Sequence, residues 1–395
     1  MLEQPYRVAT SDAPQMVIKN VQALRGIAAL LVVLFHMGDV QGLERRYISP
    51  ELDLTQVFGW FGWAGVDLFF VISGFIMVVT TWNQFAKPRA GIRFFLRRLV
   101  RVYPAYWLVL VPVFVVYVIR PDFVNAHGTR PDVLASFLLL PQAGDPLLLV
   151  SWSLVFEMEF YLVFAIALLL PRRFLPYVVG AWVLAIVVAA NLVSFTANPY
   201  GTLLGSWLSL EFIFGMIVGA LTMSNALRRP VTALAAGTLV LGAAFVAMAS
   251  PLHVEFPVWA QIAGIALPFA VLLYGAVGVE RLRSWQAPSA LVLLGDASYA
   301  IYLWHVPVLS AFGRCVELLH LHGAAAHAVV DLLFVAAVML VGIAVYRYLE
   351  RPLTRALNRR IGSVDGATPP LAVSRLEAAP DAPAPERPAA SVPHA

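Results

Sequence analysis

An arginine and a histidine stand in an otherwise apolar segment near the start of the chain, where charged groups are costly. Arg25 and His36 are eleven residues apart in the run from Asn20 to Gly38. At 100° per residue, both side chains lie on one face of a helix, and about 16 Å of helix separates their heights. Such a pair is expensive inside a membrane unless it lines a polar path through protein. It therefore predicts chemistry that involves both sides of a bilayer.

Later apolar segments carry further ionisable side chains, which we expect near His36 in the outer half of the membrane. They are Asp67, Glu157, Glu159, Glu211 and His305. Imidazole beside carboxylate suits general acid–base chemistry, because a carboxylate can orient the ring and stabilise its charged form. We expect Asp67 or Glu157 to do this.

Each of these residues also has a plainer interpretation. Glu157 and Glu159 are about 200° apart on a helix, so at most one of them faces a given site. Glu211 can pair with a donor on a neighbouring helix. His305, in the sequence YLWHVP, fits an aromatic belt at the membrane surface as well as it fits a site.

A basic cluster and a small polar residue complete the candidates. Arg97, Arg98 and Arg101 suit a phosphorylated ligand, since the guanidinium fork matches phosphate oxygens; an anchor at the cytoplasmic surface is the alternative. Ser73 precedes Gly74, a pattern that favours close helix packing over a nucleophile, because no histidine is near in sequence. Cys315 is the only cysteine, and the Cys/His spacings of zinc sites are absent, so no metal is expected.

Composition assigns these residues to a polytopic membrane protein with an all-α fold. The chain has 395 residues, 60% of them hydrophobic and 13% charged, and its mean hydropathy is +0.79. Ten segments have the length that a helix needs to span a bilayer. We predict ten transmembrane helices, near residues 21–38, 61–82, 102–119, 150–170, 174–193, 203–222, 231–249, 258–277, 289–310 and 326–347. A shorter run, Val133–Pro141, is expected to be re-entrant or interfacial.

Basic residues alternate between the loops, and this alternation gives the protein an orientation. One set of loops holds twelve of them, namely Lys87, Arg89, Arg93, Arg97, Arg98, Arg101, Arg172, Arg173, Arg228, Arg229, Arg281 and Arg283. The other set holds five, namely Arg45, Arg46, Arg120, Arg130 and Arg314. Positive loops face the cytoplasm, so both termini are predicted there, in a protein that crosses the cytoplasmic membrane several times. Topology explains the positive charge, and no nucleic-acid partner is expected.

The chain divides into three parts on this basis. Residues 1–20 form a hydrophilic cytoplasmic lead without the apolar core of a cleaved signal. Residues 21–350 form the ten-helix membrane domain. The Pro- and Ala-rich tail, residues 363–395, is expected to be disordered, because it has too little apolar surface to bury.

These motifs, in this order, resemble the membrane acyltransferase-3 family, bacterial proteins that O-acylate carbohydrates and related acceptors with acyl-CoA. The similarity covers about 330 residues and is strongest for stand-alone exopolysaccharide acetyltransferases. The matching segments are QALRGIAALLVVLFH, GVDLFFVISGF, RRLVRVYPAYW, WSLVFEMEFY, EFIFGM, GDASYAIYLWHVPVL and YLERP. Other members carry a periplasmic hydrolase-like domain, and no such domain is seen in this sequence.

The resemblance implies that His36 is the catalytic histidine, with Arg25 as its partner in the motif. It also implies acyl-CoA contacts from Arg98 and Arg101, and it matches Glu157 to the glutamate of the WSL-x-x-E pattern. We expect the chemistry to involve His36, Asp67 and Glu157. The substrate or acyl-CoA contacts are expected from Arg25, Ser73, Arg98, Arg101, Glu211, Tyr302 and His305.

The predicted function is transfer of an acyl group, expected to be acetyl, from acyl-CoA to a hydroxyl of an exopolysaccharide, another surface glycan or its lipid-linked precursor. Acyl-CoA is a donor substrate, and no permanently bound cofactor is expected. Polysaccharide-synthesis proteins are potential partners. Three alternatives remain: a transporter or flippase for a glycan precursor, a non-catalytic scaffold, and O-acylation of a non-polysaccharide acceptor. The lack of internal repeats argues against the transporter, and the cost of a buried Arg–His pair argues against the scaffold.

Overall fold

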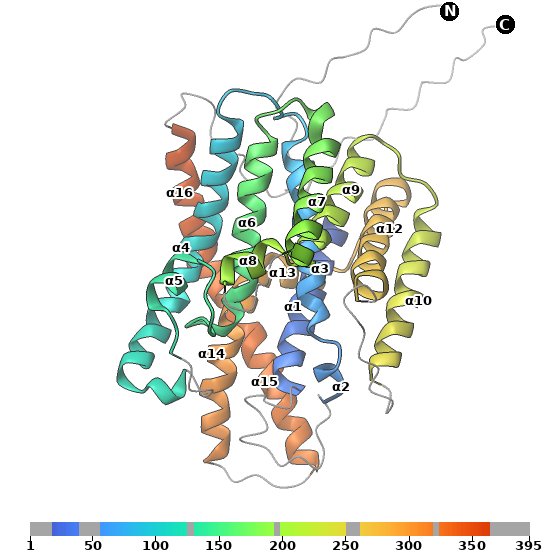
Figure 1. Ribbon diagram of the computed structural model, residues 1–395. Coiled ribbons are helices and arrows are strands. Elements are labelled where there is room, and N and C mark those ends of the chain that lie inside the picture. The colour runs from blue at the N-terminus through green and yellow to red at the C-terminus, as the bar shows by residue number, and fades with distance from the viewer. Residues whose placement is uncertain are drawn as a thin grey trace, which may run out of the picture.

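The computed structural model describes residues 18–38, 56–124, 130–192, 198–249, 261–318 and 324–363. Within these ranges the protein is a bundle of helices and contains no strand (Figure 1). The predicted all-α fold is therefore confirmed. The predicted disordered tail and most of the N-terminal lead lie outside the described residues.

Long helices alternate with short connecting helices along the chain. The longer α-helices are α1 (Lys19–Gly38), α3 (Ala64–Thr81), α4 (Ala90–Ile119), α6 (Trp152–Ala167), α7 (Leu175–Leu192), α9 (Ser209–Met223), α10 (Pro230–Met248), α12 (Leu267–Arg283), α14 (Ser298–Glu317), α15 (Ala324–Val345) and α16 (Arg351–Ser363). The short ones are α2 (Gln56–Gly59), α5 (Val133–Leu138), α8 (Pro199–Leu204) and α13 (Ser289–Asp296). Two π-helical turns, Ile262–Ala266 and Tyr346–Glu350, lead into α12 and α16.

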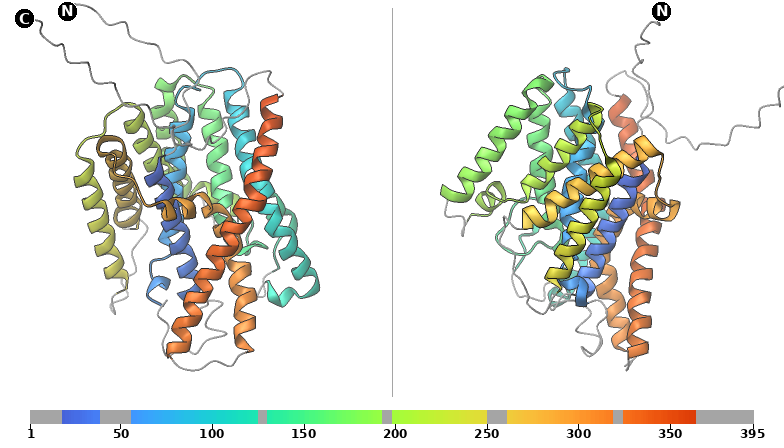
Figure 2. Two further views of the ribbon diagram at one scale, coloured as in Figure 1. Left: turned by 180° about the vertical axis from the view of Figure 1, so that it is seen from behind. Right: turned by 90° about the vertical axis from the view of Figure 1, so that its right-hand side faces the viewer.

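Every predicted membrane segment contains a helix, but one of the ten is broken. Among the described residues, nine helical spans are long and apolar enough to cross a membrane. The predicted helix 289–310 is instead the pair α13 and α14, which meet at an angle of 70°. Helix α13 lies across the middle of the bundle, and α14 runs from there to one end (Figures 1 and 2). Hydropathy alone misses this break because the residues on both sides of it are apolar.

Two helices are longer than the sequence pattern predicts. Helix α4 begins at Ala90 instead of residue 102, so Arg98 and Arg101 lie within the span and not in a loop. Helix α15 continues through the π-helical turn into α16, which packs against α4. The arginines in the first turns of α4 lower the local hydropathy, which is why the sequence pattern places the start of the membrane helix too late. Long arginine side chains can nevertheless lie along a membrane helix and reach toward the surface.

Glycines let the central helices α1, α3 and α9 approach closely. A Cβ atom on Gly65 would lie 2.4 Å from the Ala28 carbonyl oxygen, and one on Gly215 would lie 1.8 Å from that of Val71. Gly74 faces α9 in the same way, where a Cβ would lie 1.9 Å from the Phe212 oxygen. The predicted close packing around Ser73–Gly74 is confirmed. Small residues have this role because van der Waals packing drives helix association in lipid.

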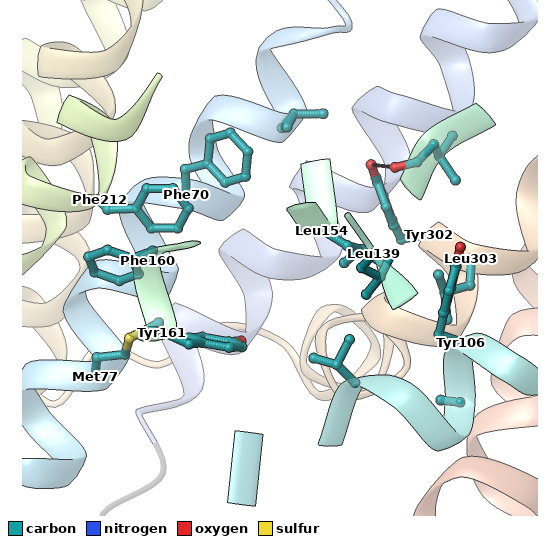
Figure 3. Packing of buried hydrophobic residues seen from close by; sticks show 14 of the residues in the cluster. Phe70, Met77, Tyr106, Leu139, Leu154, Phe160, Tyr161, Phe212, Tyr302 and Leu303 are labelled. Carbon is teal, nitrogen blue, oxygen red and sulfur yellow. Dashed lines mark hydrogen bonds between the residues drawn. The ribbon is translucent and has the colours of Figure 1, made fainter. Parts of the chain in front are cut away.

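Stacked aromatic rings fill the space between α3, α6 and α9. The Phe212 ring lies 4.5 Å from that of Phe70 and 4.2 Å from that of Phe160, measured between centroids (Figure 3). All three rings are buried. The stack fixes α6 against the α3–α9 pair, and α6 carries Ser153 and Glu157 toward the other side.

The loops sort onto two ends of the bundle as the charge alternation predicts. Arg172 lies over the Trp82 ring, 4.2 Å from its centroid, which joins two loops of the basic set. At the other end, Arg314 lies 4.2 Å from the Phe123 ring centroid. The short helix α5 lies on α4, where Tyr106 donates a hydrogen bond to the Ser136 carbonyl at 2.7 Å. Which end faces the cytoplasm stays a prediction.

Candidate active site

A cavity with both polar and apolar lining residues lies between α1, α3, α4, α6 and α14. It holds about 690 Å³ of empty space, part of it open to solvent, and about 70 Å³ of this admits the centre of a water molecule. Six of the side chains predicted from the sequence line it, together with three hydroxyl-bearing residues that the prediction missed. The six are Arg25, Ser73, Arg98, Arg101, Glu157 and Tyr302, and the three are Ser153, Ser298 and Tyr299.

Arg25 is the centre of a charged network at one end of this cavity. Its side chain is 8% exposed and donates a hydrogen bond to Gln22 Oε1 at 3.0 Å. It interacts electrostatically with Arg101 and with three carboxylates, Glu350, Asp296 and Glu157. Two cations among three carboxylates can remain charged in a low-dielectric interior, because the opposite charges offset the cost of losing water.

Glu157 belongs to this charged end. Its Oε1 atom accepts a hydrogen bond from Tyr161 and another, 3.3 Å long, from Ser73 Oγ. Arg98 lies over the Tyr161 ring, 5.3 Å from the centroid. The expectation that Glu157 lies at the depth of His36 is wrong, because Glu157 interacts with Arg25, which precedes His36 by about three turns of α1.

The break between α13 and α14 brings a helix start to the cavity, and two groups there were missed. The Glu350 carboxylate interacts with the Ala300 amide in the first turn of α14 and with Arg101 and Arg25. The Ser298 hydroxyl is fully buried, lines the cavity and has no hydrogen-bond partner within the described part of the chain. The YLERP motif contained the signal for Glu350, whereas Ser298 becomes apparent only once α14 is seen to begin inside the bundle.

Two histidines meet beyond the far end of the cavity. His305 Nε2 lies 3.3 Å from His36 Nδ1, and the ring centroids are 4.8 Å apart with the rings inclined at 64°. His36 Nδ1 also lies 2.9 Å from the Val32 carbonyl oxygen, and His305 Nδ1 lies 2.6 Å from that of Tyr302. His305 is fully buried, which places it inside the bundle and not in an aromatic belt at its surface.

Helix α14 connects the cavity to the histidine pair. Ser298, Tyr302 and His305 are four and three residues apart, so they share one face of the helix. The Tyr302 hydroxyl lies 2.6 Å from Ser153 Oγ and donates to the Val150 carbonyl at 2.8 Å (Figure 3). The Tyr302–Ser153 contact therefore lies between the charged end and the histidines.

Asp67 and Glu211 occupy a different place from the one expected. Gly65 packs against Ala28, so Asp67, two residues further along the antiparallel α3, is nearly three turns deeper than His36. Asp67 and Glu211 are both buried and interact electrostatically with each other between α3 and α9. Neither lines the cavity. Glu159 turns away to Ser209, whose hydroxyl lies 3.5 Å from Oε2, as the 200° separation from Glu157 predicts.

The arrangement separates two chemical abilities. Arginine side chains in a cavity that also offers hydroxyl groups can pair with an anionic group and form hydrogen bonds to polar groups beside it. A buried histidine against a partly buried one presents an imidazole that can exchange a proton. Among the described residues, no cluster of three or more His, Cys, Asp or Glu could hold a metal ion.

Comparison with known proteins agrees with this arrangement. The family model described as an acyltransferase domain matches residues 18–348. The chain therefore belongs to the membrane acyltransferase-3 family, and it is a multi-pass membrane acyltransferase. No solved structure matches it.

Several curated relatives extend over most of the chain. It is 36% identical over 303 residues to the exopolysaccharide production protein ExoZ of Rhizobium meliloti, covering 74% of this chain and 90% of ExoZ. It is 29% identical to the putative membrane-bound transacylase BcsY of Komagataeibacter xylinus, covering 84% of this chain and 82% of BcsY. It is 25% identical to the peptidoglycan O-acetyltransferase OatA of Listeria monocytogenes, covering 86% of this chain and 56% of OatA.

Proposed function

We propose that this protein transfers an acyl group, in the simplest case acetyl, from acyl-CoA to a hydroxyl of an exopolysaccharide or its lipid-linked precursor. The observation that carries the proposal is the position of the cavity. Three arginines form one end, and α14 connects the other end to a pair of histidines. The name of the ExoZ relative supports an exopolysaccharide as the acceptor.

The donor enters from the arginine end in this account. The phosphates of acyl-CoA pair with Arg98 and Arg101, because the guanidinium group donates two parallel hydrogen bonds to phosphate oxygens. With the basic loops facing the cytoplasm, this end is the one that cytoplasmic acyl-CoA reaches in the inner membrane.

The cavity suits the pantetheine arm in both length and polarity. The distance along α1 from Arg25 to His36 is about 16 Å, and an extended arm is of comparable length, on the order of 15–20 Å. The arm carries two amides, and Ser298, Ser153 and Ser73 offer hydroxyls along the cavity.

Acyl transfer then takes place at His36. As the acceptor oxygen attacks the thioester carbonyl, His36 takes the hydroxyl proton. The carbon–sulfur bond breaks, and the proton passes to the thiolate, so the products are an O-acyl ester and free coenzyme A. In a two-step variant, His36 carries the acyl group before the hydroxyl attacks.

The function is tested with purified protein in lipid nanodiscs, acyl-labelled acetyl-CoA and the extracted glycan. The proposal predicts label in an alkali-sensitive ester on the glycan, with one coenzyme A released for each ester. It predicts that His36→Ala abolishes both products and still binds acetyl-CoA. Transfer that survives in His36→Ala would contradict the role of His36. Glycan movement across the bilayer without thioester consumption would instead support the transporter.

A further inference from the structure

The hydrogen bonds around the two histidines decide which ring nitrogen carries each proton. His305 Nδ1 faces the Tyr302 carbonyl at 2.6 Å and also interacts with the Ile301 carbonyl. Both neighbours are acceptors, so Nδ1 of His305 must carry a hydrogen. In the neutral ring, the lone pair of His305 is then on Nε2, the atom that faces His36.

The same reasoning applies to His36. Its Nδ1 atom lies 2.9 Å from the Val32 carbonyl oxygen and 3.3 Å from His305 Nε2. Two acceptors around one nitrogen require a hydrogen on it, shared between a shorter and a longer contact. The neutral His36 ring is therefore protonated on Nδ1, and its lone pair is on Nε2.

We propose that His305 is a positioning residue that, together with the Val32 carbonyl, holds His36 as the Nδ1-protonated tautomer and so presents Nε2 as the base. This proposal rests on the proposed function for its consequence in the reaction, but the tautomer itself is a property of the resting protein. It assigns to a neutral imidazole the orienting role for which the sequence predicted Asp67 or Glu157.

The pair also stabilises the charge that forms during the reaction. When His36 Nε2 accepts the hydroxyl proton, the ring becomes a cation whose Nδ1 hydrogen already points at two acceptors. Hydrogen bonds to a charged group are about twice as strong as neutral ones. Because His305 is fully buried and its Nδ1 hydrogen is held by backbone carbonyls, its ring keeps one orientation throughout.

Helix packing explains why this ring can act as a fixed support. His305 lies on α14 between Tyr302 and Pro307 of the same helix. The Tyr302 hydroxyl contacts Ser153 of α6 and the carbonyl of Val150 in the turn that precedes α6. Helices α1 and α14 pack directly against each other. The His36–His305 contact is thus set by three helices and does not depend on a mobile side chain.

The tautomer is measured directly by ¹⁵N solid-state NMR of the full chain in lipid bilayers with labelled histidine. The resonance that disappears in His36→Gln reports on His36. The proposal predicts an Nδ1-protonated, Nε2-unprotonated ring. In His305→Leu the Val32 carbonyl, 2.9 Å from Nδ1, remains as an acceptor, so a partial shift toward the Nε2-protonated form is expected. An unchanged signal in His305→Leu would show that the Val32 carbonyl alone sets the tautomer and would refute the role of His305. An Nε2-protonated His36 in the wild-type protein would overturn the proposal, whatever the enzyme proves to acylate.

Kinetics separate positioning from general packing. His305→Leu is expected to lower kcat on the order of 10²-fold with little change in the KM for acyl-CoA, whereas His305→Gln, whose amide oxygen can accept from His36 Nδ1, recovers most of the rate. Phe312→Leu is the matched control: it loosens α14 against Phe334, far along the helix, and is expected to keep kcat. Equal losses of kcat in His305→Leu, His305→Gln and Phe312→Leu would show that His305 only packs and would refute the proposal.

Discussion

The two ends of the candidate site achieve polarity in the membrane in opposite ways. At the charged end, Arg25 and Arg101 are surrounded by Glu157, Asp296 and Glu350. At the other end, His36 and His305 meet backbone carbonyls and each other. The charged end therefore consists of groups that can carry full charges of both signs, whereas the histidine end consists of imidazole rings and backbone carbonyls.

This difference between the two ends indicates that the arginines bind the donor and the histidines carry out the transfer in the proposed reaction. Fixed charges suit a group that stays charged from entry to release, such as a phosphate. A neutral ring suits charge that appears only in the transition state, and interactions made only there raise kcat. Substitutions at the two ends should therefore differ in whether they change KM or kcat.

The largest effect is expected at the histidine end. His36→Gln should lower kcat by about 10³-fold, within the range for loss of a general base, and leave acyl-CoA binding unchanged. Equilibrium binding of labelled acyl-CoA and single-turnover rates measure the two quantities separately. Loss of acyl-CoA binding in His36→Gln would contradict the assignment of binding to the arginine end and of catalysis to the histidine end.

At the charged end, Arg101→Ala should raise the KM for acyl-CoA about 10- to 100-fold, the value of one hydrogen bond to a charged group. The rate at saturating donor should change much less. Arg120→Ala provides the control, because Arg120 lies at the opposite end of α4 and pairs with Asp122 at 3.8 Å. A fall in kcat at unchanged KM in Arg101→Ala would place the chemistry among the arginines.

Tyr302 lies between the two ends and tests how they are joined. Tyr302→Phe removes the hydroxyl that bonds to Ser153 and to the Val150 carbonyl, whereas the 3.2 Å hydrogen bond from Ser153 Oγ to the Val150 carbonyl remains. The substitution should lower the free energy of unfolding by about 1–2 kcal/mol. Thermal denaturation in nanodiscs measures this loss. If stability is unchanged while kcat falls more than tenfold, then the Tyr302 hydroxyl takes part in the reaction itself.

The smallest effect is expected at Ser298, whose buried hydroxyl lines the cavity and has no hydrogen-bond partner among the described residues. Ser298→Ala should raise the KM for acyl-CoA about fivefold, the worth of one neutral hydrogen bond, without lowering the melting temperature. Ser136→Ala is the opposite case, because Ser136 Oγ accepts from the Leu147 amide at 3.0 Å. That variant should lose stability and keep its KM, and the same pattern in Ser298→Ala would assign Ser298 a purely structural role.

The sequence predicted the helices and the chemical types of the site well, but it predicted depth poorly. Length and hydropathy found every membrane segment, and helix periodicity separated Glu157 from Glu159. The depth of each polar residue was counted from predicted helix ends. Because α4 begins at Ala90 and not at residue 102, Arg98 and Arg101 lie within the helix and line the same cavity as Glu157.

Long-range contacts could not be predicted from one chain. The His36–His305 pair joins residues 269 positions apart, and either histidine alone resembles a satisfied interfacial residue. The break before Ser298 is equally hidden, because α13 packs against α1 through another long-range contact. A Cβ atom on Gly295 would lie 1.8 Å from the Gln22 carbonyl oxygen.

In the proposed reaction, one acyl-CoA molecule extends from the arginines to the histidines. Cryo-electron microscopy of the protein in nanodiscs with a non-reactive thioether analogue of acetyl-CoA tests this most directly. We predict phosphates against Arg98 and Arg101, the pantetheine arm along Ser298 and Tyr302, and the thioether sulfur beside His36. An analogue bound with its sulfur remote from His36, or outside the cavity altogether, would contradict the account.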